Sequence, residues 1–351
     1  MIDSDVHNEL PKLKTLLPYL GEQWQVYLNE SAFRGTGADD YPANSPVAAR
    51  EGSRPESGPP GSDIDLLRTY VFDKMGADLA ILNCGFRPGS VHNQDLAADL
   101  ATAVNNWQTE QWLDKDERFR ASIIVSNQNP LRSAAEIDRI GNHPGFVQVV
   151  VPVRGDAPYG NLRYDPLFEA ATRHNLPILI AFGGAPGLPP TATGWPSTYV
   201  EEYVDAGAIF QSQVNSLIFE GAFDRFPTLR IVLSESGWTW MPSLMWRMDK
   251  EWKGLRRDTP WVKRRPSEYM REHIRLTTAP TDRPSPERAN ELTEMIDYLG
   301  SDQMLLFASD YPHWHGEEPT AWMSDLSDEL KSRLTHTNAA EFYGLEVSTT
   351  A

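Results

Sequence analysis

The chain has 351 residues and carries 49 acidic against 32 basic side chains, which gives a formal net charge of −17. This charge would repel phosphate backbones and anionic lipids, so we expect neither nucleic acid nor a membrane as a partner, but a small-molecule substrate. Cys84 is the single cysteine, which excludes an intrachain disulfide, and the sequence shows neither a signal peptide nor an apolar run of membrane-spanning length, so we expect a cytoplasmic protein.

Eight short β-rich runs recur along the chain, and several are almost continuously apolar, which is typical of parallel strands covered on both faces. They are residues 1–6, 78–84, 120–126, 146–153, 176–182, 229–235, 273–278 and 304–310. Helical patterns fill most of the intervals between them. These patterns span residues 63–76, 93–113, 132–140, 165–175, 197–226, 241–255 and 285–300.

Eight strands with helical crossovers predict a single distorted (β/α)8 (TIM) barrel of the α/β class, with a doubly wound sheet as the alternative. Residues 31–62 interrupt this pattern and are rich in Gly, Pro and Ser. Only one strand precedes them, and one strand cannot form a domain, so we interpret the segment as a loop inserted after strand one rather than a linker. We therefore predict that residues 1–351 form one domain.

Polar side chains stand where the predicted strands end, and the active sites of such barrels lie at the carboxyl ends of the strands. Asp5 and His7 alternate on strand one, Glu235 ends strand six and Asp310 ends strand eight. All four are residue types that ligate metals or transfer protons. Each carboxylate alone is better explained as a helix cap or a partner for loop amides. Their joint placement at strand ends favours a functional site.

Three motifs carry a resemblance to a known family: "MIDSDVH" at the start, "FDRFPTLRIVLSESGWTWMP" in the sixth unit and "LLFASDYPHW" in the eighth. They resemble the amidohydrolase superfamily, in particular the amidohydrolase-related branch that includes aminocarboxymuconate semialdehyde decarboxylase and the aromatic acid decarboxylases. The resemblance runs nearly the full length of the chain. It implies a distorted barrel, a divalent metal at the strand ends, either hydrolysis or nonoxidative decarboxylation, and, by analogy, a homodimer.

The resemblance matches Asp5 and His7 to the metal pair of strand one, and Asp310 to the aspartate of strand eight that touches the metal and moves a proton. Two histidines of the family are missing, because the strand-five position is Ala181 and the strand-six position is Glu235. The implied ligands Asp5, His7 and Asp310 are rich in carboxylates, which favours Mn²⁺ or Mg²⁺, with Zn²⁺ still open. If the metal has been lost, the clustered carboxylates would hold a proton and act as acids and bases.

Further candidates lie near the predicted mouth of the barrel. His313, three residues after Asp310, is predicted to orient that aspartate or to shuttle a proton, whereas His315 is expected at the surface. Arg154, at the end of strand four, is predicted to clamp a substrate carboxylate, with a salt bridge to a nearby acid as an equal alternative. The remaining candidates for substrate binding, each with a structural alternative, are His92, Trp238 and Trp314.

The favoured hypothesis is hydrolysis of an amide or lactone bond in a small aromatic or cyclic substrate, with Asp310 moving the proton of an activated water and Glu235 beside it. The second hypothesis is nonoxidative decarboxylation of an aromatic or unsaturated carboxylic acid, in which Asp310 protonates the ring carbon before CO₂ leaves. The third is a metal-free acid–base hydrolase or a non-catalytic binding protein on a degenerate barrel, suggested by the missing strand-five histidine.

Overall fold

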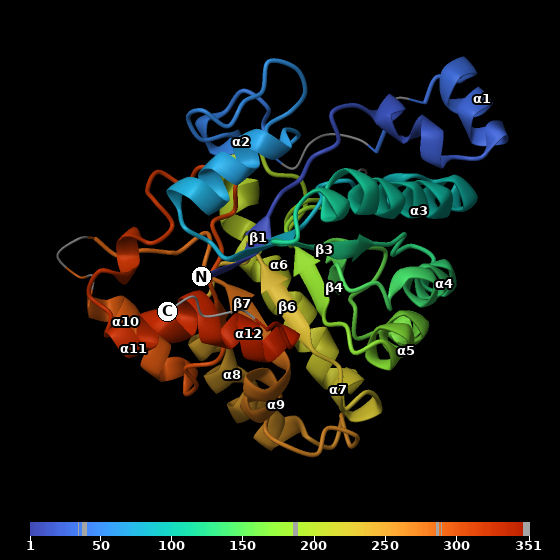
Figure 1. The fold of residues 1–351 in the computed structure, drawn as a ribbon. Coiled ribbons are helices and arrows are strands. Elements are labelled where there is room, and N and C mark those ends of the chain that lie inside the picture. The colour runs from blue at the N-terminus through green and yellow to red at the C-terminus, as the bar shows by residue number, and fades with distance from the viewer. Residues whose placement is uncertain (34, 37–40, 185–188, 286–287, 289, 347–351) are drawn as a thin grey trace.

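The computed structural model describes residues 1–33, 35–36, 41–184, 189–285, 288 and 290–346 (Figure 1). Eight parallel strands form one sheet, and their spatial order follows the order of the chain. They are β1 (Ile2–Val6), β2 (Leu79–Leu82), β3 (Phe119–Ile124), β4 (Phe146–Pro152), β5 (Ile178–Ala181), β6 (Ile231–Ser234), β7 (Ile274–Thr277) and β8 (Leu305–Leu306).

The sheet curves until its two edge strands meet. The backbone nitrogen of Ser4 donates to the carbonyl of Phe307 at 2.9 Å, and that of His7 donates to the carbonyl of Tyr311 at 2.7 Å. These bonds join β1 and the residue after it to the residues that follow β8, so the predicted (β/α)8 barrel is confirmed.

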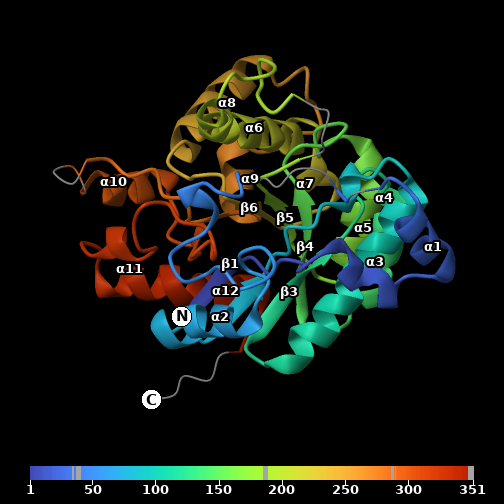
Figure 2. The ribbon, with the colours of Figure 1, turned by 90° about the horizontal axis from the view of Figure 1, so that it is seen from above.

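Helices surround the strands, as the view from above shows (Figure 2). They are α1 (Glu22–Glu30), α2 (Ile64–Arg68), α3 (Gln94–Gln111), α4 (Pro130–Ile140), α5 (Asp165–Arg173), α6 (Tyr199–Phe219), α7 (Ala222–Arg225), α8 (Met241–Leu255), α9 (Pro266–His273), α10 (Asn290–Leu299), α11 (Asp328–Ser332) and α12 (Asn338–Tyr343). Within the described ranges, no helix combines the length and the apolarity needed to cross a membrane.

Strands β5 and β6 are buried along their whole length. The helices cover the outer face of the barrel wall, and the packed interior covers the inner face, so neither face of a strand contacts water. This double burial explains why their sequences, ILIA and IVLS, do not alternate between apolar and charged residues.

The chain between β1 and the inserted loop differs from the expectation, because it is helical. It contains a 3₁₀ helix (Leu13–Tyr19) and α1, which lies beside α3 and is held there by a hydrogen bond from Trp24 Nε1 to Asp99 Oδ2 at 2.5 Å (Figure 1). No residue of α1 is fully buried. Trp24 and Leu28 pack against the core only in part, and a segment of nine residues is too short for its apolar spacing to stand out in the sequence.

The described part of the inserted loop, residues 31–33, 35–36 and 41–62, folds back over the carboxyl ends of the strands. The carbonyl of Gly61 accepts a hydrogen bond from the backbone nitrogen of Glu9 at 3.1 Å, and the nitrogen of Arg50 donates to the carbonyl of Pro312 at 2.8 Å. Glu9 follows β1 and Pro312 follows β8. The loop is thus fastened to both sides of the seam at which the barrel closes.

Candidate active site

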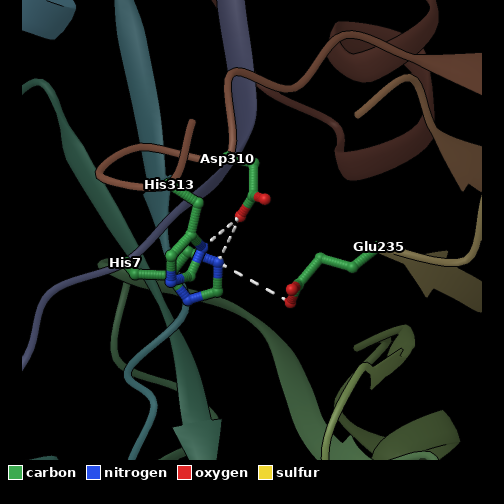
Figure 3. A group of neighbouring side chains, drawn as sticks. All are labelled: His7, Glu235, Asp310 and His313. Carbon is green, nitrogen blue, oxygen red and sulfur yellow. Dashed lines mark hydrogen bonds and ion pairs between the residues drawn. The ribbon is translucent and has the colours of Figure 1, made fainter. Parts of the chain in front are cut away.

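Four side chains meet at the carboxyl ends of the strands (Figure 3). They are His7, Glu235, Asp310 and His313, and each offers one ligand atom that lies within 4.8 Å of the others. His7 follows β1, Glu235 follows β6, and both Asp310 and His313 follow β8. We refer to these four residues as the imidazole–carboxylate cluster.

Asp310 is the hub of this cluster. Its Oδ1 atom lies 2.8 Å from Nε2 of His7 and 2.9 Å from Nδ1 of His313. Its Oδ2 atom lies 2.5 Å from Nε2 of His315. Glu235 Oε1 is farther from His7, at 3.7 Å from Nε2. One buried carboxylate therefore contacts three imidazoles, and the second carboxylate faces the same space.

Both carboxylates of the cluster stand on an unusual backbone. Glu235 has φ = +60° and Asp310 has φ = +55°, in the left-handed region that residues with a Cβ seldom adopt. Hydrogen bonds hold both turns: Glu235 N donates to Oγ1 of Thr277 at 3.2 Å, and Asp310 N donates to the carbonyl of Asp5 at 3.1 Å. Backbone strain of this kind occurs at functional sites, where the surrounding structure enforces it.

Asp5 lies beside the cluster and is held by neighbouring polar groups. Its Oδ1 accepts a hydrogen bond from Nδ2 of Asn83 at 2.6 Å, its Oδ2 accepts one from Oγ of Ser234, and Oδ1 also lies 3.6 Å from His7 Nε2. Both oxygens of Asp5 thus have donors from β6 or from the residue after β2. Asp5 contributes a negative charge next to His7.

The orientation of His7 is set by the carbonyl oxygen of Asn83, which lies 3.0 Å from Nδ1. A carbonyl oxygen only accepts, so Nδ1 carries a hydrogen and Nε2 is left to face the carboxylates. Burial alone lowers the pKa of His7, but the charge of Asp5 and the contact with Asp310 outweigh burial and raise this pKa well above its usual value. The surroundings therefore favour a positive charge at Nε2, either a proton or a metal ion.

The pKa values of the two carboxyl groups of the cluster are shifted in opposite directions. Burial and the charge of Asp310 hold the pKa of Glu235 well above its usual range. Burial would also raise the pKa of Asp310, but the imidazoles of His313, His315 and His7 outweigh it and hold this pKa well below its usual range. Burial lowers the pKa of His313 to about 4, so its ring is neutral near pH 7. A pair of acids pushed apart in this way is suited to holding and transferring one proton.

A cavity of about 480 Å³ opens onto the cluster. Its wall combines polar groups near the strand ends with aromatic rings, and about half of it comes from the inserted loop. The wall includes His7, Tyr41, Phe86, Phe182, Glu235 and His313. Two cations, Arg54 of the inserted loop and Arg87 after β2, also line it. The volume is typical of sites for small organic ligands.

The structure brings together five residues at the carboxyl end of the barrel, and their catalytic and metal-binding roles stay predictions: Asp5, His7, Glu235, Asp310 and His313. His315 is a correction, because its side chain is only 17% exposed and bonds to Asp310. His315 was expected at the surface because it lies in a loop, but a position in a loop does not indicate the direction in which the loop folds.

The four residues predicted to bind substrate are not among the described residues of the cavity wall. Arg154 forms a salt bridge with Glu202 at 3.2 Å, and His92 is exposed. Trp238 is fully buried and its ring centroid lies 5.9 Å from that of Trp322, while Trp314 lies 5.2 Å from the guanidinium of Arg50. Substrate binding by Arg154, His92, Trp238 and Trp314 stays a prediction.

Sequence reasoning missed several residues of the site. Asn83 follows β2 and Ser234 ends β6, so both were open to the strand-end argument that found the carboxylates. Tyr41 and Arg54 belong to the inserted loop, where neither periodicity nor a motif marks a functional side chain. Their positions depend on how the loop folds over the barrel.

A scan against models of known protein families matches residues 2–345 to the amidohydrolase family. The chain belongs to this family. The family membership predicted from the three motifs is thereby confirmed, and the match extends over almost the whole chain.

Curated relatives of this chain include several decarboxylases, two of which are described here. A gamma-resorcylate decarboxylase from Rhodococcus jostii strain RHA1 is 25% identical over 315 residues, which are 81% of this chain and 88% of the relative. The decarboxylase orsB of Emericella nidulans is 24% identical over 292 residues, which are 74% of this chain and 77% of the relative.

Solved structures share the fold. A dihydroxybenzoic acid decarboxylase from Polaromonas sp. JS666, solved with bound manganese and the inhibitor 2-nitroresorcinol, superimposes with a TM-score of 0.70 at 20% identity, covering 99% of this chain and 97% of that chain. An amidohydrolase from Mycobacterium avium subsp. paratuberculosis K-10 gives a TM-score of 0.73 at 21% identity, covering 99% and 98%.

Proposed function

We propose that this protein is a metal-dependent, nonoxidative decarboxylase of a small aromatic carboxylic acid. The observation that carries the proposal is the imidazole–carboxylate cluster at the base of a cavity of about 480 Å³. Hydrolysis was the favoured hypothesis from sequence, but curated relatives of the chain are decarboxylases, which supports the second hypothesis better.

The donor set of the cluster fits a divalent cation. His7, Glu235, Asp310 and His313 supply two imidazoles and two carboxylates, and Nε2 of His7 faces the carboxylates. Mixed oxygen and imidazole ligands suit manganese or zinc, and the carboxylate share favours manganese. When bound by these residues, such a cation would supply Lewis-acid polarisation of an oxygen-bearing substrate. The resemblance implied Asp5, His7 and Asp310 as ligands; we keep His7 and Asp310 in this role and propose that Asp5, which is not in the donor set, acts by its charge instead.

The protein's own residues would hold the substrate and move one proton. Phe86, Phe182 and Tyr41 offer aromatic walls for a ring, and Arg54 and Arg87 offer positive charge for anionic groups. Decarboxylation needs one proton at the ring carbon, after which the bond to the carboxyl carbon breaks and CO₂ leaves. Asp310 would deliver this proton, which the imidazole of His315 beside its Oδ2 can pass to it.

A labelling experiment tests the reaction. The Mn²⁺-loaded protein is incubated in D₂O with a panel of ortho-hydroxybenzoic acids, and CO₂ release is measured together with the deuterium content of the product ring. We expect CO₂ and one deuterium at the carbon that carried the carboxyl group. A parallel panel of lactones and anilides tests the hydrolysis hypothesis.

The outcomes separate the three hypotheses. Acid release from a lactone or anilide without CO₂ would overturn the proposal in favour of hydrolysis. Turnover that persists after removal of all metal would refute the metal dependence and favour catalysis by acids and bases alone. Turnover in neither panel, at any metal content, would favour a binding protein. Dimerisation and a cytoplasmic location stay predictions.

A further inference from the structure

Tyr41 is the residue through which the inserted loop reaches the cluster. Its side chain is 6% exposed, and its hydroxyl donates to Oε2 of Glu235 at 2.7 Å while lying 3.5 Å from Oδ2 of Asp310. Its ring stacks on the imidazole of His313, with centroids 3.7 Å apart and an angle of 18° between the planes. One side chain from outside the barrel therefore contacts three members of the cluster.

Other aromatic rings fix Tyr41 in place. Phe182 and Tyr203 each meet its ring edge-on with centroids 5.9 Å away. Phe182 directly follows β5, which ends in Ala181, so this part of the barrel offers a packing surface and no ligand atom. The ring of Tyr41 is thus held between the end of β5, helix α6 and the loop after β8.

The contact with Glu235 decides how that carboxylate is presented. Oε2 is occupied by the hydroxyl of Tyr41, and Oε1 is the oxygen that faces His7 Nε2, at 3.7 Å. A carboxylate without such a partner can rotate and exchange its two oxygens. The bond from Tyr41 therefore selects one rotamer of Glu235 and directs a single oxygen into the cluster.

We infer that Tyr41 is a positioning residue for the metal group: its hydroxyl fixes Glu235 and its ring fixes His313, so the inserted loop completes the site from outside the barrel. This inference rests on the proposed function, since it assigns Tyr41 to the same cluster. The two contributions are separable, because Tyr41→Phe removes only the hydroxyl, whereas Tyr41→Leu removes the stacked ring as well.

Binding of Mn²⁺ is the first readout, measured by equilibrium dialysis on full-length protein without substrate. Partners of metal ligands are typically worth roughly 10- to 100-fold in metal affinity, so we expect Tyr41→Phe to weaken Mn²⁺ binding by at least about tenfold. Tyr41→Leu should weaken it further. The matched control is Tyr70→Phe, because Tyr70 also donates to a carboxylate, Glu318, at 2.7 Å, but away from the cluster.

The second readout, the melting temperature of chelator-treated protein, does not need the metal. Tyr41→Phe leaves a buried carboxyl oxygen without its donor, which should lower the melting temperature by roughly 1–4 °C. Glu318 has a side chain that is 50% exposed, so water can replace the hydroxyl of Tyr70 and the control should shift far less.

The outcomes are distinguishable from failure of the proposed function. If the wild type binds Mn²⁺ and Tyr41→Phe binds it within twofold, the inference is overturned while the metal site stands. If the wild type binds no Mn²⁺, the metal-dependent function fails, and an unchanged melting temperature in Tyr41→Phe would then overturn the positioning of Glu235 as well. A shift confined to Tyr41→Phe would retain that positioning.

Discussion

Replacing Asp310 with Asn tests the hub of the site, because it keeps the shape of the side chain and removes its charge. Asp310 is fully buried, and its carboxylate oxygens lie 2.8 Å from an imidazole nitrogen of His7, 2.9 Å from one of His313 and 2.5 Å from one of His315. An amide has one acceptor oxygen, whereas a carboxylate has two. In the variant, the NH₂ group must therefore face at least one imidazole N–H that donates to Asp310 in the wild type, and two donors would oppose each other. Each lost charge-assisted hydrogen bond is worth about 1.5–3 kcal/mol.

The expected consequence for catalysis is large. Loss of a positioned proton-transfer group costs about 10²- to 10⁴-fold in rate, which corresponds to roughly 3–5 kcal/mol in the barrier. Asp310→Asn should therefore lower kcat/KM for decarboxylation by at least about 100-fold. The assay is CO₂ release under saturating Mn²⁺, with metal content and near-ultraviolet circular dichroism measured on the same sample to verify the fold.

Asp116→Asn is the matched control, because Asp116 precedes β3 at the opposite end of the barrel and should leave kcat/KM unchanged. An Asp310→Asn protein that keeps more than a tenth of the wild-type activity with full metal content would refute the assignment of proton transfer to this carboxylate. Tolerance of the substitution is what the binding-protein hypothesis expects.

Three further predictions concern stability. Chelation should abolish turnover and lower the melting temperature, and Mn²⁺ at 100 times its Kd should restore about 2.7 kcal/mol. Burial alone raises the pKa of Asp116, but its contacts with Arg118 and Arg68 outweigh burial and lower this pKa. Asp116→Asn should therefore lower the melting temperature at pH 7. The difference from wild type should disappear as the pH falls below the lowered pKa, because Asp116 is then protonated and neutral like Asn. Gly160→Ala should cost about 1–3 kcal/mol in denaturant titrations, because its Cβ would clash with the carbonyl oxygen of Ser216.

The strands of the barrel were predictable because burial on both faces leaves a direct mark on the sequence. Apolar runs such as ILIA and IVLS are too short for a buried helix, and their repetition between helical patterns favours parallel strands. Since the active end of a parallel barrel is known from topology alone, Asp5, Glu235 and Asp310 could be assigned to one site before any coordinate was available.

The rest of the site depends on packing that no local pattern reports. Tyr41 lies 194 residues from Glu235 in sequence, and only the fold of the inserted loop brings them together. Trp238 follows a strand end as a site residue would, yet it points into the core against Trp322. A strand-end position therefore indicates which edge of the barrel a residue occupies, but the direction of its side chain is decided by tertiary contacts.

The left-handed backbone at Glu235 and Asp310 has a consequence for laboratory evolution. Each costs roughly 1–3 kcal/mol relative to an unstrained conformation, and glycine at either position would relieve that cost. At Glu235, whose side chain accepts a hydrogen bond from Tyr41, a screen that selects heat-resistant variants would accordingly enrich glycine and return folded, inactive protein. At Asp310 the loss of the contacts with three imidazoles outweighs the relief of strain. Thermostability and turnover are opposed at Glu235, so a stabilised variant must be selected for both properties together.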